Sequence, residues 1–559
     1  MARTKAATRP KAAPKRAAPR RAAPVQRKRV GAAYMKGEAN PFFHSWRPAL
    51  REASDDVRSA YLLAASRAVD TIQNSGWISG GVEQAVAMTV GQSLRLSARP
   101  DADALGWTQD TAQTWARKVE RRWEGYANTP IECDIEGKST VGKMTAQGLR
   151  TWFCYGEIVA ALPWLRRRFG QYGTKVQMLP PHRMSQDTLS DTGLFQGVFR
   201  DRYGFPLGYR MLNPPQGRQP LMQAYTDVAA RDAEGRPRMI HVFDGFPGQA
   251  RGIPPITPAL KVVKQFDQLS DATLTAALIQ SIFAATIKSP EPTEVVLQAF
   301  QDLAEQRLGT VPDGSPSTPL EAMLESRAGW YDGTQIDLGG HGKVAHLAPG
   351  DELAFNSTQH PNSTYEAFVR FLLREIARCL GITFEQLTGD YSGATYSSVR
   401  MATSEIWMMT IYRRVNILAP FLQAIYESWL EEEIENGWIE FPGGIGGFLM
   451  ARAAASRSHW RGPAKPQADD LKFAKAVEAL KGLGVITDEW ICAEMGEDWE
   501  DIYEQRAREM ALRKKLGLPE PSAKVATARD AIGSGERDDD DDDEREDDDE
   551  REDERLIRS

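Results

Sequence analysis

The sequence predicts an α+β protein in which helix dominates after residue 254 and both ends are disordered. Between residues 172 and 252 the chain is rich in Gly and Pro and contains short β-type runs such as "FQGVFRDRYGFPLGYRML". Such runs indicate a small sheet with hairpins. Before and after that region, apolar residues recur at helical spacing over long stretches. A chain of 559 residues is also long enough to bury a sizeable core and to form more than one compact unit.

Three helices are predicted before the Gly/Pro-rich region. The first covers Ser54–Gln73, where apolar residues form a stripe along one face. The second covers Thr108–Gly125, with either Thr108 or Asp110 as its N-cap. The third begins near residue 144 and is broken at Gly156, a residue that commonly ends helices.

Helix is predicted again from Pro254 to Ile287, where it is opened by a proline pair. A Gly-rich, loop-like stretch follows at residues 309–345. The next helix covers Tyr365–Leu380, with Tyr365, Phe368, Leu372, Ile376 and Leu380 on one face, and Gly381 is well placed to end it.

Three more helices are expected towards the C-terminus. One begins near Tyr396 and carries apolar residues as far as Pro420. Two others lie within residues 467–515. The first of these ends at the Gly482 and Gly484 region, and the second begins with Thr487 as its N-cap.

The two ends of the chain carry dense charge of opposite sign. Residues 1–30 contain eleven Lys or Arg and no acid, and residues 536–555 contain sixteen Asp or Glu against four Arg. Both compositions are typical of disordered, solvated tails. The basic arm favours either a polyanion such as nucleic acid or simple solubilisation. The acidic run could mimic nucleic acid, repel it, hold a neighbour's basic arm, or only solvate the chain.

Composition excludes several classes of protein. The four cysteines lie far apart without CxxC or Cys/His spacing, so we expect no zinc or other metal site and reduced thiols in a cytosolic setting. The N-terminus has no apolar stretch behind its basic residues and is not a secretory signal. The longest apolar run, Leu274–Ile287, is too short to span a bilayer. We therefore expect a soluble protein with no membrane partner.

One motif suggests a nucleotide-driven DNA enzyme of the terminase ATPase type. "GKSTVGKM" (Gly137–Met144) matches the phosphate-binding P-loop pattern except at its last position, where Ser or Thr should ligate Mg²⁺. The preceding "TPIECDIE" could be a strand, and "MIHVFD" ends in Asp244 like a magnesium-holding acid. The thioether of Met144 is a poor ligand for a hard cation, which favours a plain Gly/Lys turn.

No other stretch has the pattern of a catalytic site. HExxH and GxSxG motifs are absent from the sequence. His341 and His346 are five residues apart in a Gly-rich loop, a spacing that is more often incidental than metal-binding. Asp390 and Ser392 resemble a base and a nucleophile, but no third residue to orient them is evident. We expect no catalytic residue, cofactor or enzymatic activity.

A row of arginines is the more informative pattern. Arg370, Arg374 and Arg378 repeat every fourth residue and share one side of the predicted helix. Their guanidinium groups could contact phosphates or the acids of a neighbouring chain. The alternative is a solvated face on which Glu366 pairs with Arg370 and Glu375 pairs with Arg378.

Four long stretches carry motifs in a fixed order. Ser363–Trp407 holds a helix, the break "LGI", the linker "DYSGATYSSVR" and a second helix, and Ile240–Leu260 holds "PGQARGI". Asn40–Gly91 contains "NPFFHSW" and "NSGWISGGVEQ", and His459–Met510 contains "HWRGPAKPQADDL". Together these stretches resemble the portal proteins of lambda-like tailed phages, over residues 35–520. The charged tails are the departures from the family pattern.

The resemblance implies a homo-oligomeric ring, commonly of twelve subunits, at one vertex of the phage head. Double-stranded DNA, bound without sequence specificity, would pass through the ring during packaging and ejection. The implied partners are the terminase large subunit, the head–tail adaptor, and the major capsid and scaffold proteins. The implied location is the virion, with assembly in the host cytoplasm, and the family has no enzymatic activity of its own.

The resemblance also implies a portal-type protomer with wing, stem, clip and crown. The expected segments are a disordered basic arm (1–30), the wing (31–360), the first stem helix (361–380), the clip (381–395), the second stem helix with a channel loop near 413–420 (396–420), a wing return (421–460), a helical crown (461–520) and a disordered acidic tail (521–559).

This layout supplies the candidate site residues. The clip turn would dock a partner through Asp390, Tyr391, Ser392 and Tyr396. The candidates for the DNA channel or the ring interface are Arg370, Arg374, Arg378, Arg413 and Arg414.

Overall fold

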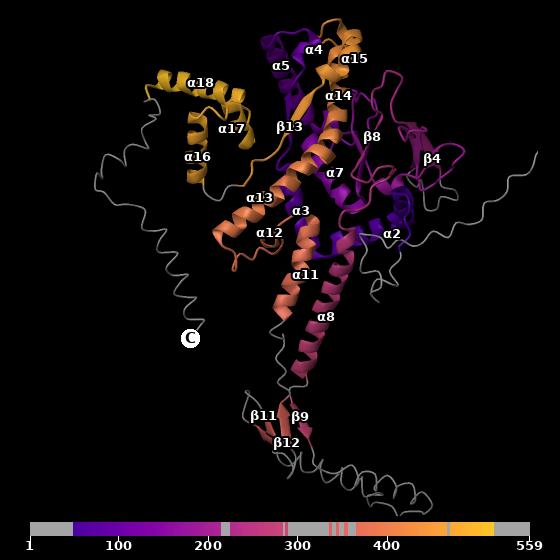
Figure 1. Ribbon diagram of the computed structural model, residues 1–559, viewed down its shortest axis with the longest axis vertical. Helices are drawn as coiled ribbons and strands as arrows, with labels where there is room; N and C mark the ends of the chain where they lie inside the picture. Colours follow the sequence, from indigo (N-terminus) through magenta and orange to yellow (C-terminus); the bar gives the residue numbers. More distant parts are fainter. Residues whose placement is uncertain are drawn as a thin grey trace, which may run out of the picture. The chain divides into compact units, whose positions relative to one another are not determined.

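The computed structural model describes residues 48–213, 224–282, 285–288, 335–337, 343–345, 352–355, 365–466 and 470–518. The chain divides into two units, Met1–Glu52 and Ala53–Ser559, and every element named below lies in the second. The predicted tails (1–30 and 521–559), together with His341 and His346, lie outside the described residues. The described part is helix-rich with several small sheets, as the sequence predicts (Figure 1).

The α-helices are α2 (Ala53–Asn74), α3 (Gly76–Val90), α4 (Ala102–Leu105), α5 (Gln109–Ala127), α6 (Pro130–Cys133), α7 (Val141–Tyr155), α8 (Leu260–Ile282), α11 (Tyr365–Leu380), α12 (Phe384–Thr388), α13 (Tyr396–Arg413), α14 (Ala419–Glu435), α15 (Gly444–Ala455), α16 (Asp470–Gly482), α17 (Asp488–Glu494) and α18 (Trp499–Leu516). The short 3₁₀ and π segments are η1 (Pro181–Arg183), η2 (Thr257–Ala259) and η4 (Arg414–Leu418). The strands are β1 (Arg95–Ala98), β2 (Glu157–Ala161), β3 (Gln177–Leu179), β4 (Leu194–Phe195), β5 (Val198–Arg200), β6 (Pro206–Leu212), β7 (Tyr225–Ala229), β8 (Met239–Phe243), β9 (Ala285–Lys288), β10 (Gln335–Asp337), β11 (Lys343–Ala345), β12 (Glu352–Phe355) and β13 (Ser458–Arg461).

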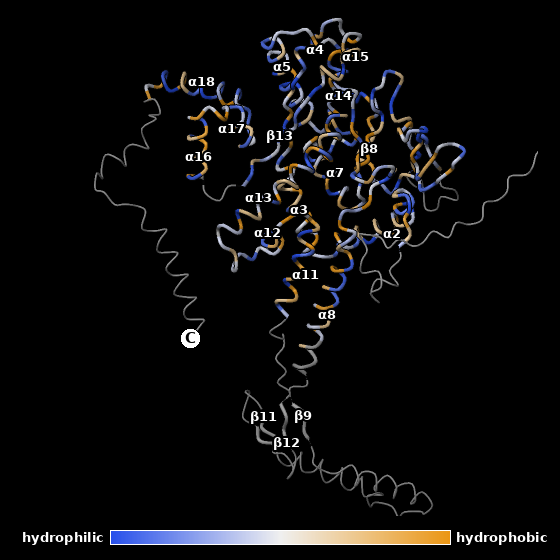
Figure 2. The backbone as a smooth tube through the Cα atoms, viewed as in Figure 1, coloured by the Kyte–Doolittle hydropathy of each residue, from blue (hydrophilic) through white to orange (hydrophobic). Residues whose placement is uncertain are grey.

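One large hydrophobic core joins helices that are far apart in the sequence. Figure 2 shows hydrophobic residues gathered along α3, α7 and β8, which run through this core. Helix α14 contributes Phe421, Tyr426 and Trp429, which are fully buried. The Trp429 ring meets that of Trp123 from α5 edge to face, with centroids 5.2 Å apart. Such aromatic contacts bury large areas and hold the N-terminal helices on the later ones.

The predicted β region is confirmed. Strand β2 lies between β3 and β8 in an antiparallel sheet, so that Val159 faces Leu179 on one side and His241 on the other. A second antiparallel sheet has the strand order β4-β5-β6-β7, as expected for successive hairpins. Strands β1 and β13 form a separate pair in which Arg95 lies opposite Arg461.

The prediction of helix as far as Ile287 is wrong at its C-terminal end. Helix α8 ends at Ile282, and β9, which begins at Ala285, pairs antiparallel with β12. The stretch at 309–345, predicted to be loop-like, likewise contains β10 and β11, which pair with each other. Short apolar runs do not distinguish a buried helix from a strand. For this reason the helix predicted from apolar spacing extended beyond the true end of α8.

Helices α8 and α11 pack against each other, and the β9–β12 pair lies in the chain between them. Figure 1 shows the two helices side by side. The resemblance instead led us to expect that α11 and α13 would be the paired helices.

The segment expected to form a loop near 413–420 is helical. Helix α13 continues through the π-helix η4 into α14. Pro420 directly follows the π-helix, as the second residue of α14. Proline removes an i→i−4 hydrogen bond from a helix interior, and a π-helical turn is a place where that regular hydrogen-bond pattern is already interrupted. The proline therefore does not end the helical run. The prediction that the helix stops at Pro420 is wrong.

Several predicted helix ends are confirmed. Thr108, not Asp110, is the N-cap of α5, and its hydroxyl accepts a hydrogen bond from the Thr111 N–H. Thr487 caps α17 in the same way. Gly381 follows the last residue of α11 with a φ of +66°, a conformation that glycine adopts without strain.

Candidate functional site

The turn between α12 and α13 is held by its own side chains. Thr383 and Thr395 each form a capping box, at the N-termini of α12 and α13. The Asp390 carboxylate accepts hydrogen bonds from the Ser392 N–H at 3.0 Å and from the Ser392 hydroxyl at 2.6 Å. Asp390 therefore shapes the turn.

The candidate docking residues differ in how exposed their side chains are and in whether they are bonded within the protomer. Tyr391 is 54% exposed, and Ser392 is exposed as well. Asp390 also pairs with Arg370 of α11 at 3.2 Å. The Tyr396 side chain lies outside the described residues, although its backbone begins α13.

The arginine row does not behave as one unit. Arg370 pairs with Glu366 at 2.9 Å, as one of the alternatives predicted, and with Asp390. The Arg374 guanidinium lies over the Phe384 ring at 5.5 Å. Arg378 is 78% exposed and pairs at 3.9 Å with Glu405 of α13, not with Glu375.

Arg413 and Arg414 are buried inside the protomer. Arg413 donates a hydrogen bond to the Leu380 carbonyl at 2.6 Å, and Arg414 donates to the carbonyls of Thr89 at 2.8 Å and Met88 at 2.9 Å. Burial lowers the pKa of each guanidinium to about 10. Both groups bind the chain's own carbonyls, so neither matches the prediction of a side chain that faces the DNA channel or a neighbouring subunit.

The P-loop-like stretch has no free phosphate cradle. The Asp134 carboxylate accepts hydrogen bonds from the backbone N–H groups of Glu136 (3.1 Å), Lys138 (2.9 Å) and Ser139 (2.9 Å). Lys138 and Ser139 belong to the P-loop-like motif, whose backbone N–H groups a P-loop would turn towards a nucleotide phosphate. The expected preceding strand is instead the short helix α6.

The two other residues considered for a P-loop site, Met144 and Asp244, are also engaged within the protein. Met144 is buried at 1% exposure within α7. Asp244, the proposed magnesium-holding acid, accepts a hydrogen bond from the Tyr412 hydroxyl at 2.9 Å. The geometry therefore favours a structural turn, as the residue at position 144 suggested.

The described residues contain no group of three or more His, Cys, Asp or Glu side chains placed to hold a metal ion. Among the helices that the structure describes, none combines the length and apolarity needed to cross a bilayer. All four cysteines are unpaired.

A family model described as "Phage portal protein, lambda family" matches residues 40–414 of the chain. The chain belongs to the lambda family of phage portal proteins. It is 30% identical over 493 residues to the portal protein of Escherichia phage N15, which covers 87% of this portal chain and 91% of the relative. It is 29% identical over 501 residues to portal protein B of Escherichia phage lambda, with 88% and 91% covered.

The solved structures to which the chain is similar include two from gene transfer agent (GTA) particles. The first, from the neck of an empty GTA particle, has a TM-score of 0.40 at 12% identity and covers 81% of this portal chain and 94% of that one. The second, from the neck of a native GTA particle, has a TM-score of 0.35 at 14% identity, with 79% and 100% covered.

The portal-family motif "PGQARG" contains an arginine, Arg251, that is not among the predicted site residues. Arg251 is fully buried, and its Nε lies 2.9 Å from both carboxylate oxygens of Glu157 on β2. It also donates to the Tyr61 hydroxyl of α2 at 2.8 Å, and His241 of β8 contacts Glu157 at 2.9 Å. The cluster thus connects α2 to the strands β2 and β8. In the sequence, the family motif that contains Arg251 was the signal that could have identified this residue.

Two glycines allow the chain to approach this cluster. Gly156 has a φ of +81°, and a Cβ there would lie 2.2 Å from the backbone of Ile253. A Cβ on Gly252, the last residue of the motif, would lie 2.1 Å from the Gly156 carbonyl oxygen. Only glycine fits such a close backbone contact, so the motif serves the packing of this portal chain.

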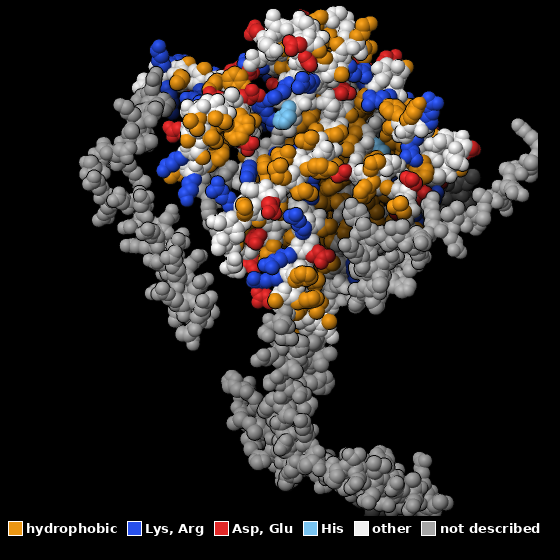
Figure 3. Space-filling model, in the orientation of Figure 1, with side chains coloured by type: hydrophobic (Ala, Val, Ile, Leu, Met, Phe, Trp, Pro, Cys, Tyr) orange, Lys and Arg blue, Asp and Glu red, His pale blue; other side chains and the backbone are white. Residues whose placement is uncertain are grey.

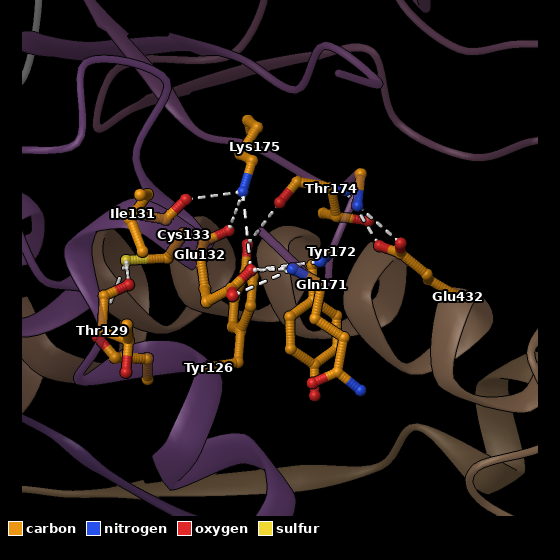
Figure 4. Close-up of polar contacts among 12 residues, drawn as sticks. Tyr126, Thr129, Ile131, Glu132, Cys133, Gln171, Tyr172, Thr174, Lys175 and Glu432 are labelled. Carbon is orange, nitrogen blue, oxygen red and sulfur yellow. Dashed lines mark hydrogen bonds and ion pairs between the residues drawn. The ribbon is translucent and has the colours of Figure 1, made fainter. Parts of the chain in front are cut away.

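A second buried cluster surrounds Lys175, as Figure 4 shows. Its amine is fully buried and donates to the carbonyls of Ile131 at 2.8 Å and Glu132 at 2.7 Å. Burial lowers the pKa of Lys175, and the nearby Glu132 carboxylate partly offsets this. Gly173 and Thr174 precede Lys175 in the same loop. Their backbone N–H groups donate hydrogen bonds to the carboxylate of Glu432 on α14, at 2.6 Å and 2.8 Å. Because the lysine amine is engaged by carbonyls, the cluster is structural.

Proposed function

We propose that this chain assembles into a closed ring of about twelve copies at one capsid vertex, and that double-stranded DNA passes through the ring during packaging and ejection. The observation that carries the proposal is the family match over residues 40–414, together with 30% identity to a phage portal protein over 493 residues. The ring would be part of the virion and would assemble in the host cytoplasm.

The mechanism follows from the symmetry of a ring. Head-to-tail contacts that close on themselves leave a central hole lined by the same residues from every copy. A single exposed charge thereby becomes a band of charge that meets phosphates without reading bases. Arg378 is the best placed of the arginine row for such a role or for a ring contact, because it is 78% exposed and its ion pair is long.

We propose a stem different from the one that the resemblance first indicated. Helices α8 and α11 pack together, and the β9–β12 pair in the chain between them would form the core of the clip. Residues 381–395 then become the connection between α11 and α13, which contains α12. The remaining layout stands as proposed, with a wing before α8, a wing return at 421–460 and a crown at 461–520.

The partners would be the terminase large subunit, the head–tail adaptor, and the capsid and scaffold proteins. Tyr391 and Ser392 support a docking role for the α12–α13 turn, because both are exposed on a turn that its own hydrogen bonds hold in place. ATP hydrolysis would come from the terminase, and this chain would need no cofactor.

Native mass spectrometry of the purified chain, combined with averaged electron-microscope views, tests the proposal. We expect a closed ring of about twelve copies with a central hole. ATP hydrolysis by the chain alone that disappears in Lys143→Ala would instead support the nucleotide-driven alternative. A monomer without such activity would direct the next experiment to assembly with scaffold protein.

A further inference from the structure

Helices α17 and α18 contact the rest of the protomer through ion pairs with one consistent polarity. In each pair the arginine lies on the body and the carboxylate on or beside these helices. Arg95 pairs with Glu497 at 2.5 Å, Arg99 with Glu489 at 2.6 Å, Arg117 with Glu500 and with Glu504 at 3.4 Å, Arg121 with Glu504 at 3.2 Å, and Arg461 with Asp498 at 2.5 Å. We call Arg95, Arg99, Arg117, Arg121 and Arg461 the arginine face. Figure 3 shows Lys/Arg and Asp/Glu side chains close together in this region.

Apolar packing contributes little to this contact. No residue of α17 or α18 is buried, and Trp490 and Met495 are 45% and 58% exposed. Pockets of about 780 Å³ and 390 Å³, both open to solvent, lie along this contact. Because no residue of α17 or α18 is buried, charge contributes more than apolar packing to holding the helices in place.

The arginine face needs an anionic cover. Arg95 and Arg461 lie directly opposite each other on β1 and β13. Arg117 and Arg121 are one helical turn apart on α5. Like charges at both kinds of position repel each other unless an anion lies between them. The carboxylates of the C-terminal helices supply that anion in the protomer.

The cover leaves donor capacity unused. The Nε of Arg461 is buried without a hydrogen-bond partner, and Arg121 is 68% exposed beside a single carboxylate partner, Glu504. A guanidinium presents a rigid fork of donors that a phosphate group satisfies better than one carboxylate oxygen does.

We propose that the arginine face is a binding surface for the phosphate backbone of duplex DNA, which helices α17 and α18 cover and which DNA uncovers by displacing them. The inference rests on the proposed function, because a DNA conduit brings a dense row of phosphates to the protomer. A duplex carries one phosphate charge per roughly 1.7 Å of its axis, so several phosphates can contact arginines that lie on β1, β13 and α5. Exposed ion pairs are weakened by salt and exchange readily, so a polyanion can replace them.

The test compares two full-length variants of equal charge. E489Q/E497Q/E504Q removes three carboxylates that contact the arginine face, and leaves Asp498, which caps α18, intact. E478Q/E494Q/E509Q removes three carboxylates of the same region that form none of these pairs. Fluorescence anisotropy of a short labelled duplex, at low and physiological salt, measures DNA binding. Hydrogen exchange of residues 488–516 measures release of the helices.

We expect E489Q/E497Q/E504Q to bind the duplex about tenfold more tightly than the control variant, with a steeper salt dependence and faster exchange in α17 and α18. Adding R95Q/R99Q/R121Q should return binding to the wild-type level. Equal binding by the two amide variants would overturn the proposal, because the gain would then reflect net charge alone.

Two further outcomes also overturn it. Faster exchange in α17 and α18 without tighter DNA binding would show that the helices leave the arginine face but that DNA does not bind there. Tighter binding that appears only after residues 536–559 are deleted would make the chain's own acidic run the occupant of the face. Native mass spectra of the same samples report ring formation, so a failure here leaves the proposed function separately tested.

Discussion

The carboxylate of Glu157 and the guanidinium of Arg251 form a fully buried ion pair, with Arg251 Nε 2.9 Å from each carboxylate oxygen. The two residues are far apart in the sequence, on β2 and in the family motif that precedes α8. Tyr61, Gln196 and Pro181 accept the remaining guanidinium hydrogens. This pair therefore joins α2, the three-stranded sheet and the four-stranded sheet.

Arg251→Met should destabilise the protein by about 3–5 kcal/mol, because it leaves the Glu157 charge buried without a partner. Chemical denaturation followed by tryptophan fluorescence measures the change. Arg457→Met is the matched control. Arg457 is 65% exposed and its pair with Asp101 is 3.6 Å long, so the loss should stay within about 0.5 kcal/mol. Equal effects of the two substitutions would contradict a structural role for the buried pair.

The same pair predicts sensitivity to acid. Burial would raise the pKa of Glu157, but the charge of Arg251 and hydrogen bonds from His241 and Arg251 outweigh it and lower the pKa to about 2. A lowered folded-state pKa gives stability that is present above the unfolded pKa of 4.5 and is lost as the pH falls towards 2. The stability difference between wild type and Glu157→Gln should therefore shrink from pH 5 to pH 3, as urea titrations can show. A constant difference would contradict this.

Local patterns predicted the elements whose ends depend on neighbouring residues. The bounds of Tyr365–Leu380, the end at Gly381 and the cap at Thr487 all follow from contacts within a few residues. Helical spacing also found the buried face of α11, where Leu372, Ile376 and Leu380 are buried.

Partners distant in the sequence could not be predicted in this way. Arg414 looked like a surface charge, yet its acceptors are the carbonyls of Met88 and Thr89, more than 300 residues earlier. Phe368 belongs to the apolar stripe of α11 but is 53% exposed, because the buried part of α11 begins one turn later, at Leu372. Helix α8 changes to strand β9 because β12 pairs with it, and that pairing leaves no local signal.

Glu120 should make the region beneath α17 and α18 sensitive to pH. Its pKa is raised to about 7 by burial and by nearby Asp498, against a hydrogen bond from the Ala98 N–H. A raised pKa on an acid means that ionisation costs stability as the pH rises from 4.5 to 7. Glu120→Gln should match wild type near pH 5 and be more stable by up to about 3 kcal/mol at pH 8. Thermal unfolding at both pH values checks this, and an unchanged difference would contradict it.

Arg414→Met should destabilise the protein without affecting DNA binding. The substitution leaves the carbonyls of Met88, Thr89 and Pro463 without their donor, at a cost of about 2–4 kcal/mol. Arg400→Met on the exposed side of α13 is the control and should be nearly neutral. Denaturation and duplex-binding assays separate the two effects. Weaker DNA binding with unchanged stability would contradict this and would support the predicted role of Arg414 as a residue of the DNA channel.

Tyr391→Ser should leave the protomer stable but weaken its contact with a docking partner. The side chain is 54% exposed, so its loss costs little packing. Asp390→Asn is the informative comparison, because Asp390 holds the turn through Ser392 and Arg370 and its change should disturb the turn itself. Melting temperature and terminase-driven DNA packaging in vitro are the measurements. If Tyr391→Ser packages DNA normally while Asp390→Asn does not, the turn matters for its conformation and Tyr391 is not a docking residue.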